Sequence, residues 1–310
     1  MLVTFVIPCL NEDESLRPLY TGIVEQFNGK DEYRYEIMFI DDGSTDGSLS
    51  TIKQLAKDDS AVRYISFRKN MGKAIALQTG FNKCTNSDII ITMDADLQDD
   101  PSEIFNFIGK IEEGYDLVSG WKYNRLDPLE KRLPSKLFNK TISMLSGVKL
   151  HDFNCGFKAY RAEVVRSVNI YGELHRFIPV LANRSGFKIA EITVKHNKRQ
   201  FGKSKYGWER YFRGLLDAIS VTFISRFYHR PMYLFGKLGL TAFLMGTLIC
   251  VFLFVQWLAE IRIGDRPLLL LGVLLIIFGA QLVSTGLICN LVIESNFKSN
   301  YSENYIKEES

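Results

Sequence analysis

The chain has 310 residues, 46% of them hydrophobic, which is enough for one sizeable domain and additional segments. Its net charge of +3 is too small to indicate a nucleic-acid-binding protein. The five cysteines form no C-x-x-C pair, so the sequence predicts neither a disulfide framework nor a zinc site and fits a reducing compartment.

The first 120 residues alternate short apolar runs with amphipathic segments, which is typical of an α/β protein. We expect strands at 3–7, 36–40, 62–67, 88–93 and 116–119. We expect helices near 14–27, 47–57, 73–83 and 101–112. Near-continuous apolar runs favour parallel strands that are covered on both faces. The pattern therefore predicts a doubly wound, mostly parallel sheet, and no G-x-G-x-x-G follows the first strand to indicate a dinucleotide cofactor.

Acidic residues gather directly after three of these strands. Glu12 follows the first strand, Asp41 and Asp42 follow the second, and the run DADLQ at 94–98 follows the fourth. Because ligands of such sheets bind at the carboxyl ends of the strands, we expect these side chains to share one site. Carboxylates that lie close together repel one another unless a cation lies among them. A hard cation such as Mg²⁺ or Mn²⁺ takes oxygen ligands and also binds phosphate oxygens.

A basic amphipathic helix is predicted at about 128–147, with Leu133 and Leu137 on one side and Lys136 and Lys140 on the other. Such a helix lies in a membrane interface or packs on the sheet as an ordinary surface helix, and periodicity leaves both alternatives open. A second basic amphipathic stretch occupies 206–232 and leads into the apolar C-terminal part of the chain.

Two uncharged apolar segments lie at 238–255 and 267–293, and each is long enough to cross ~30 Å of hydrocarbon as a helix. The short polar link at 260–266 predicts a hairpin, and the alternative is a pair of buried core helices. Arg230 and Lys237 precede the first segment, and the positive-inside tendency then places the chain ends in the cytoplasm. We expect a multi-pass protein of the cytoplasmic membrane with the domain formed by its first 230 residues on the cytoplasmic side.

Four motifs, PCLNE, DDGSTDGS, RKNMGKA and MDADLQDDP, occur in this order and spacing. Together they resemble the family 2 glycosyltransferases of the GT-A fold, and the resemblance covers roughly residues 1–230. With a two-span hairpin, the chain is most similar to the polyprenyl-phosphate glycosyltransferase branch, which includes dolichol-phosphate mannose synthases. The resemblance implies a GT-A domain at 1–205, a juxtamembrane helix at 206–232, a hairpin at 233–296 and a polar cytoplasmic tail at 297–310.

The resemblance also implies a nucleotide and metal site. Asp94, Asp96 and Gln98 would hold Mg²⁺ or Mn²⁺. Arg68 and Lys73 would border the nucleotide. The alternative, which the sequence supports equally well, is that both are solvent-exposed surface residues without a role in binding. The residues implied around the nucleotide are Pro8, Glu12, Asp41, Asp42, Arg68, Lys73, Asp94, Ala95, Asp96, Gln98, Arg199, Ser204 and Lys205.

The implied catalytic residues are Asp96, Asp152, Arg199 and Lys205. Asp152 lies in HDFNCGFK, which matches the region where many relatives read Asp-x-Gly-Asp-Phe-Arg. The second acid of that pattern is absent here, so Asp152 either accepts a proton or only orients a substrate. The segment 199–206 matches R-x-x-G-x-S-K-Y, which closes over the diphosphate in relatives. For the acceptor phosphate the implied residues are Lys122, Arg125, Lys131, Arg132 and Ser135.

The expected activity is inverting transfer of a sugar from a UDP- or GDP-sugar to a membrane-embedded polyprenyl phosphate. The expected partners are the nucleotide sugar, the lipid and the membrane, with no nucleic acid, and a homo-oligomer is left open. One alternative is a processive polysaccharide synthase, although the chain has no Q-x-x-R-W motif. The other is a non-catalytic membrane protein that binds nucleotide sugars. The identity of the sugar and the length of the polyprenol are not fixed by the sequence.

Overall fold

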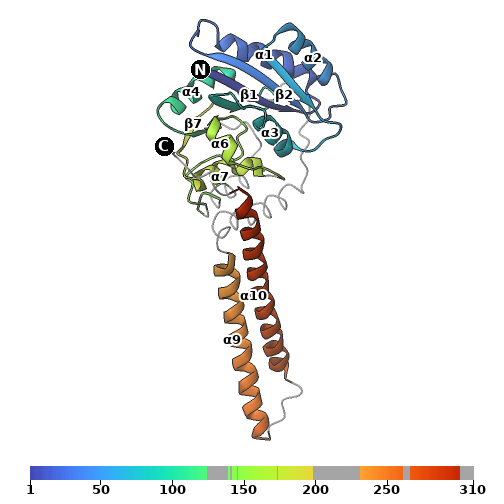
Figure 1. The fold of residues 1–310 in the computed structure, drawn as a ribbon, viewed down its shortest axis with the longest axis vertical. Coiled ribbons are helices and arrows are strands. Elements are labelled where there is room, and N and C mark those ends of the chain that lie inside the picture. Colours follow the sequence, from blue (N-terminus) through green and yellow to red (C-terminus); the bar gives the residue numbers. More distant parts are fainter. Residues whose placement is uncertain are drawn as a thin grey trace. The chain divides into compact units, whose positions relative to one another are not determined.

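The computed structural model describes residues 1–123, 139, 142–144, 146–172, 174–197, 231–260 and 266–300, of which 294–300 are described as backbone only. The chain divides into two compact units, Met1–Thr222 and Phe223–Ser310 (Figure 1). The first contains a seven-stranded sheet with helices on both faces, and the second contains two long helices.

The sheet of the first unit has the strand order β3-β2-β1-β4-β6-β5-β7. The strands are β1 (Leu2–Cys9), β2 (Arg34–Asp41), β3 (Val62–Ser66), β4 (Ile89–Thr92), β5 (Leu117–Trp121), β6 (Lys158–Arg161) and β7 (Ile189–Thr193). β1 pairs in parallel with β2 and β4, β2 pairs in parallel with β3, and β5 pairs in parallel with β7. β6 runs antiparallel to both of its neighbours, β4 and β5. The predicted mostly parallel α/β architecture is confirmed.

Alternate residues of the central strands face two separate apolar cores. Phe5 and Ile7 pack with residues of α1 (Asp13–Gln26), α2 (Ser48–Asp58) and α4 (Ile104–Glu112). Val6 and Ile90 pack on the other face with residues of α3 (Lys73–Phe81), α6 (Ala162–Ser167) and α7 (Ile178–Arg184). This alternation follows from the two-residue period of a strand. Both faces of the central strands are therefore buried, as the near-continuous apolar runs predict.

The elements predicted before residue 120 are all present, with bounds that differ by a few residues. The helix expected near 101–112 consists of a short 3₁₀ turn, η1 (Pro101–Glu103), followed by α4. Asp100 caps this turn, because its carboxylate accepts a hydrogen bond from the Ser102 backbone N–H at 3.0 Å. A second 3₁₀ turn, η2 (Leu174–Phe177), comes directly before α7. β6, α6, η2, α7 and β7 were not predicted from the sequence.

Strand order and direction together define one functional edge of the sheet. The chain reverses its direction of travel across the sheet between β1 and β4, and such a switch point forms a crevice at the carboxyl ends of the strands. Because β6 is antiparallel, the residues that precede Lys158 lie at this same edge, where Lys158 is the cross-strand neighbour of Thr92. The fold thus brings segment 151–157 beside the DADLQ run, although about 60 residues separate them in the chain.

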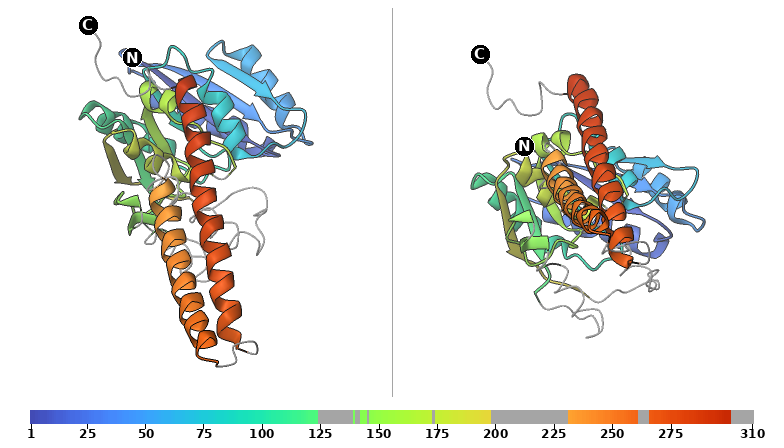
Figure 2. Two further views of the ribbon diagram at one scale, coloured as in Figure 1. Left: turned by 60° about the horizontal axis from the view of Figure 1, so that its bottom comes forward. Right: turned by 90° about the horizontal axis from the view of Figure 1, so that it is seen from below.

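The second unit is a hairpin of α9 (Pro231–Leu258) and α10 (Pro267–Asn300), which lie side by side in both views of Figure 2. Pro231–Leu258 and Pro267–Ile293 have mean hydropathies of 2.5 and 2.4 and are long and apolar enough to cross a membrane. α9 is described from Pro231, several residues before the predicted apolar segment. Most of the large apolar side chains of both helices are exposed, so the buried-core alternative is not supported.

Glycines form the seam between these two helices. A Cβ atom on Gly279 would lie 2.6 Å from the Gly239 carbonyl oxygen, and one on Gly246 would lie 2.6 Å from the Gly272 carbonyl oxygen. The backbones therefore approach more closely than any larger side chain allows. Such small-residue contacts are a common way for helices to associate in lipid, where dispersion and close packing replace the hydrophobic effect.

Candidate functional site

The Asp94 carboxylate lies at the centre of the functional edge and binds a cation supplied by the protein. It forms an ion pair with the ammonium group of Lys73, and the two side chains are each 29% exposed. Burial by itself would raise the pKa of Asp94, but Lys73 and Lys122 outweigh it and lower that pKa to about 2. Asp94 is therefore ionised at neutral pH and holds a positive charge at the position where the sequence predicts a metal ion.

Lys73 reaches Asp94 because a neighbouring carboxylate fixes the start of α3. Asp42 accepts hydrogen bonds from the backbone N–H groups of Met71 and Gly72, at 2.7 and 3.0 Å. Gly72 has a φ of 92°, which favours glycine, and Lys73 follows as the first residue of the helix. Asp42 thus shapes the loop that presents Lys73, and it contributes to the site through the backbone.

The remainder of the DADLQ run forms a tight turn. Asp96 is buried, and its carboxylate accepts a hydrogen bond from the Gln98 backbone N–H at 3.2 Å. Leu97, between them, has a φ of 60°, in the left-handed region that costs a branched residue free energy. Strained backbone of this kind clusters at functional sites, because the surrounding structure must hold it. The turn brings both aspartates to one strand end, as predicted.

Lys122 lies against Asp99 in a buried ion pair. Its ammonium nitrogen is 2.8 Å from the Asp99 carboxylate, and the two side chains are 10% and 0% exposed. Burial alone would lower the pKa of Lys122, but Asp99 outweighs this effect and raises it, so the lysine is charged. Asp99 also accepts a hydrogen bond from the Asp94 backbone N–H at 3.3 Å. Sequence reasoning gave Asp99 no role, and the structure shows that it joins Lys122 to the aspartate turn.

The loops after β1 and β2 are tied together at the same edge. Asp41 is buried and accepts hydrogen bonds from the Ser44 backbone N–H at 3.0 Å and the Ser66 hydroxyl at 2.7 Å. Asn11, with a φ of 53°, accepts a hydrogen bond from the Thr45 backbone N–H at 2.8 Å. The backbone N–H of Glu12 donates to the Ser48 hydroxyl at 2.9 Å. These bonds fix the two loops in one arrangement.

Two further predicted nucleotide residues flank this region. Pro8 belongs to β1 and is the cross-strand neighbour of Ile40, so it lies one residue before the strand ends. Arg68 is exposed just after β3, at the far side of the sheet order from β4. Ala95 is buried between the two aspartates. Of these three residues, Arg68 is the exposed one.

The loop before β6 is pinned beneath Asp94. The Thr92 hydroxyl donates to the Gly156 carbonyl at 2.7 Å, and the buried Lys158 ammonium donates to the carbonyls of Phe153, at 3.3 Å, and Cys155. Gly156 lies directly against the aspartate, since a Cβ atom there would come within 2.6 Å of an Asp94 carboxylate oxygen. Lys158 was not predicted as a functional residue, although it ends the HDFNCGFK segment, at the position of the arginine in the related motif.

Asp152 is buried in this same loop. Its backbone N–H and that of His151 donate to the Glu191 carboxylate at 3.0 and 2.8 Å, and its own carboxylate accepts from the Asn154 backbone N–H at 3.0 Å. His151 also stacks on Trp121, with ring centroids 4.1 Å apart. The Asp152 loop therefore lies at the functional edge.

Seven predicted residues lie outside the described part of the chain: Arg125, Lys131, Arg132, Ser135, Arg199, Ser204 and Lys205. Most of the predicted amphipathic helix at 128–147 also lies outside it. Among its described residues, Ile142 is buried and Met144 is exposed, and both are helical.

No group of three Asp, Glu, His or Cys side chains within the described residues is arranged to hold a metal ion. The donor set at the aspartate turn is two carboxylates and one amide, and Asp94 already carries a cationic partner. Oxygen ligands of this kind suit a hard cation that takes its remaining ligands from water and phosphate. The residue types suit the predicted ion, whereas their described arrangement, with Asp94 paired to Lys73, is not that of a metal site.

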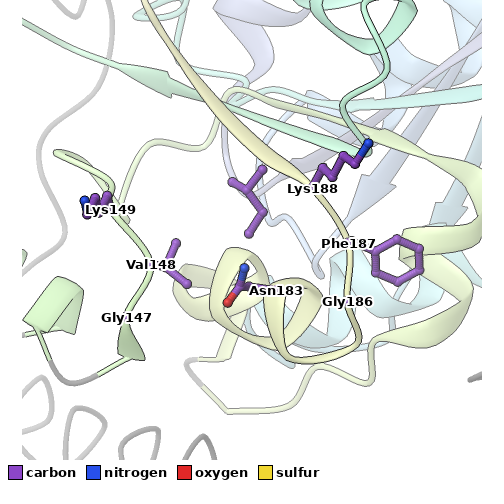
Figure 3. Close-up of a pocket in the computed structure, with 8 residues that line it drawn as sticks. Gly147, Val148, Lys149, Asn183, Gly186, Phe187 and Lys188 are labelled. Carbon is purple, nitrogen blue, oxygen red and sulfur yellow. The ribbon is translucent and has the colours of Figure 1, made fainter.

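A cavity of about 430 Å³ lies in the first unit, lined by residues other than those of the functional edge (Figure 3). It is lined by Gly147, Val148, Lys149, Asn183, Gly186, Phe187, Lys188 and Ile189. None of these residues has a carboxylate side chain, so this cavity differs in chemistry from the functional edge.

Comparison with known proteins identifies the family. Residues 4–168, more than half of the chain, match the model of Glycosyl transferase family 2. The chain belongs to this family. Among curated proteins, the glycosyltransferase is 36% identical to the dodecaprenyl-phosphate galacturonate synthase of Rhizobium johnstonii, over 98% of this chain and 91% of that protein. It is also 36% identical to the undecaprenyl-phosphate 4-deoxy-4-formamido-L-arabinose transferase of Shewanella sediminis, over 92% of this chain and 85% of that protein.

Solved structures support the fold of the glycosyltransferase. A crystal structure of glucosyl-3-phosphoglycerate synthase from Mycobacterium tuberculosis with Mn²⁺, UDP and phosphoglyceric acid superposes with a TM-score of 0.55. The two sequences are 19% identical, and the match covers 72% of this chain and 78% of that one. The likeness confirms the predicted GT-A architecture of the first unit.

Proposed function

We propose that this glycosyltransferase moves a sugar from a nucleoside diphosphate to a polyprenyl phosphate in a membrane. The observation that carries the proposal is the match to two polyprenyl-phosphate sugar transferases, which extends over more than nine-tenths of the chain. The match takes in both the sheet and the helix pair. The helix pair supplies what such an acceptor requires, because each buried CH₂ of a lipid tail contributes ~0.8 kcal/mol to membrane binding and the enzyme must reach the lipid there.

The proposed reaction is a single displacement at the anomeric carbon. An oxygen of the lipid phosphate forms a bond to that carbon, the bond to the nucleoside diphosphate breaks, and the configuration inverts. A phosphate monoester has a second pKa near ~6, so the nucleophile is largely ionised at pH 7 and needs no strong base. We therefore assign Asp152 to orienting the sugar or the acceptor through its pinned loop.

Stabilising the departing diphosphate is the larger task. Asp94, Asp96 and Gln98 are proposed to hold Mg²⁺ or Mn²⁺, which would neutralise charge on the leaving group. The Lys73 ammonium would then leave Asp94 and bind a diphosphate oxygen instead. Further hydrogen bonds to the diphosphate would come from Arg199, Ser204 and Lys205. Pro8, Glu12, Asp41, Asp42, Arg68 and Ala95 remain the proposed surroundings of the nucleotide.

The acceptor phosphate is assigned to Lys122, Arg125, Lys131, Arg132 and Ser135. For Lys122, the structure supplies a specific condition, because its ammonium already pairs with Asp99. A lipid phosphate would have to share that lysine with the carboxylate. The helix pair is proposed to span the cytoplasmic membrane, with both ends of the hairpin on the cytoplasmic side, where basic residues beside a span are favoured.

A transfer assay with separated phases tests the proposal. The full chain in detergent or vesicles is incubated with undecaprenyl phosphate and, in turn, radiolabelled UDP-galacturonate, UDP-glucose, UDP-N-acetylglucosamine and GDP-mannose. We expect label from one donor to enter the organic phase only when the lipid phosphate is present. Nucleotide sugar that binds without any label transfer would favour a binding protein, and a growing water-soluble polymer would favour a polysaccharide synthase.

A further inference from the structure

A small, partly open cavity lies beside Asp94, between the start of α3, the end of β4, the loop before β6 and η2. The residues that line it are Lys73, Leu77, Thr92, Asn154, Cys155, Gly156, Lys158, Tyr160, His175 and Arg176. Its volume is about 10 Å³, which is close to the minimum that one water-sized group requires. The cavity is therefore suited to one small polar group at a time.

Two of the lining side chains carry buried polar atoms without a hydrogen-bond partner among the described residues. These atoms are the Nδ1 nitrogen of His175 and the Oδ1 oxygen of Asn154. Buried polar atoms are nearly always paired in native proteins, because an unpaired one has lost its hydrogen bonds to water without replacement. His175 comes from η2 and Asn154 from the loop before β6, so two segments distant in sequence bring residues with unsatisfied atoms to one cavity.

The position of the cavity relates it to the donor substrate. Lys73 lines it and binds Asp94, and Gly156 lines it and lies against the Asp94 carboxylate. In the proposed function, the diphosphate is held at Asp94, and the sugar is attached directly to that diphosphate. A substituent of the transferred sugar is therefore close enough to enter the cavity.

The charge state of His175 indicates the kind of group. Burial, followed by the nearby Lys73 and Arg176 cations, lowers the pKa of His175 well below its usual value. The ring is neutral at pH 7 and offers one nitrogen as donor and the other as acceptor. A neutral imidazole and an amide bind an uncharged polar group, such as a hydroxyl, without a charged partner.

We propose that His175 and Asn154 bind one hydroxyl group of the donor sugar and so help to select which sugar is transferred. The inference rests on the proposed function. Sites that hydrogen-bond a substrate hydroxyl discriminate strongly, since an analogue without it leaves the protein atoms buried and unpaired. His175 is thus a specificity residue that the sequence motifs do not indicate.

The test compares the affinity for a nucleotide sugar with that for its bare nucleoside diphosphate. Calorimetry with Mg²⁺ measures Kd for UDP-galacturonate, UDP-glucose, UDP-N-acetylglucosamine and GDP-mannose, and for UDP and GDP, on the full chain. For the donor that binds wild type most tightly, His175→Phe should raise the ratio of sugar-nucleotide Kd to diphosphate Kd about tenfold, as expected for one hydrogen bond. His175→Asn, which keeps a polar atom near the Nδ1 position, should restore most of the wild-type ratio.

Ser119→Ala is the matched control. The Ser119 hydroxyl is also buried without a partner among the described residues, but Ser119 does not line this cavity. An unchanged ratio in His175→Phe, or an equal rise in Ser119→Ala, would overturn the inference. Failure of the wild type to transfer any sugar would instead count against the proposed function while the affinity ratio stayed measurable. Absence of binding for all four donors would contradict both.

Discussion

Replacing Gly156 with alanine should disable the aspartate turn with little effect on folding. The added Cβ would lie 2.6 Å from one Asp94 carboxylate oxygen and 2.7 Å from the other and from Cγ. Comfortable contact for such atoms begins near ~3.5 Å, so one partner must move by about 0.9 Å. The φ angle of Gly156 is not positive, and alanine therefore introduces no strain in its own backbone.

The loop cannot give way easily, so Asp94 should move. Gly156 is held by the 2.7 Å bond from Thr92 to its carbonyl, and Lys158 holds the carbonyls on the preceding residues. A displacement of about 1 Å in a positioning group costs roughly 10²-fold in rate. We expect Gly156→Ala to lower the transfer rate about 10²-fold and to weaken Mn²⁺ binding measured by electron paramagnetic resonance.

Gly109→Ala provides the control for Gly156→Ala. Gly109 lies in α4, and a Cβ there meets nothing within 4 Å, so alanine should add ~0.5–1 kcal/mol of stability and leave the rate unchanged. A Gly156→Ala protein with the wild-type transfer rate and Mn²⁺ affinity would refute the reasoning. A loss of activity accompanied by unfolding, seen as a collapsed thermal transition, would refute the assignment of the effect to Asp94.

Three further outcomes follow from contacts outside the aspartate turn. Lys158→Met should lower the free energy of unfolding by ~1–3 kcal/mol, because the buried carbonyls of Phe153 and Cys155 lose their hydrogen-bond donor. An unchanged free energy of unfolding in a denaturant titration would contradict this. Gly279→Leu should push α9 and α10 apart, whereas Leu274→Ala on the exposed face should not; spin-label distances between the helices check both. Burial raises the pKa values of Cys84 and Cys155 to about 12, so neither cysteine has an appreciable thiolate fraction at pH 8. Mass spectrometry should therefore find that iodoacetamide alkylates neither residue until urea is added.

The parallel half of the sheet and its carboxylates could be predicted because local signals agree there. The apolar runs of β1, β2 and β4 end in acidic segments, and the topology of parallel strands alone brings Asp41 and Asp94 to one edge. Lys73 was predicted beside the nucleotide, and the structure adds its ion pair with Asp94. The two apolar helices were predicted for the same reason, since length and absence of charge suffice to identify them.

The second half of the site depends on pairing that leaves no local signal. β6 has only four residues, KAYR, and a lysine in such a run argues against a buried strand. Its antiparallel register, with Lys158 opposite Thr92, is what brings the Gly156 loop under Asp94. His175 lies in a four-residue 3₁₀ turn without periodicity, so its approach to Asn154 could not be expected from spacing.

Asp94 is proposed to hold a cation that neutralises the negative charge of the departing nucleoside diphosphate. This neutralisation allows the sugar to be transferred to the lipid phosphate. The most direct measurement compares wild type with Asp94→Asn in vesicles that contain undecaprenyl phosphate and the donor that wild type uses. The account predicts that Asp94→Asn inserts and folds normally but forms labelled lipid at least about 10²-fold more slowly. Labelled lipid formed by Asp94→Asn at the wild-type rate would contradict the account.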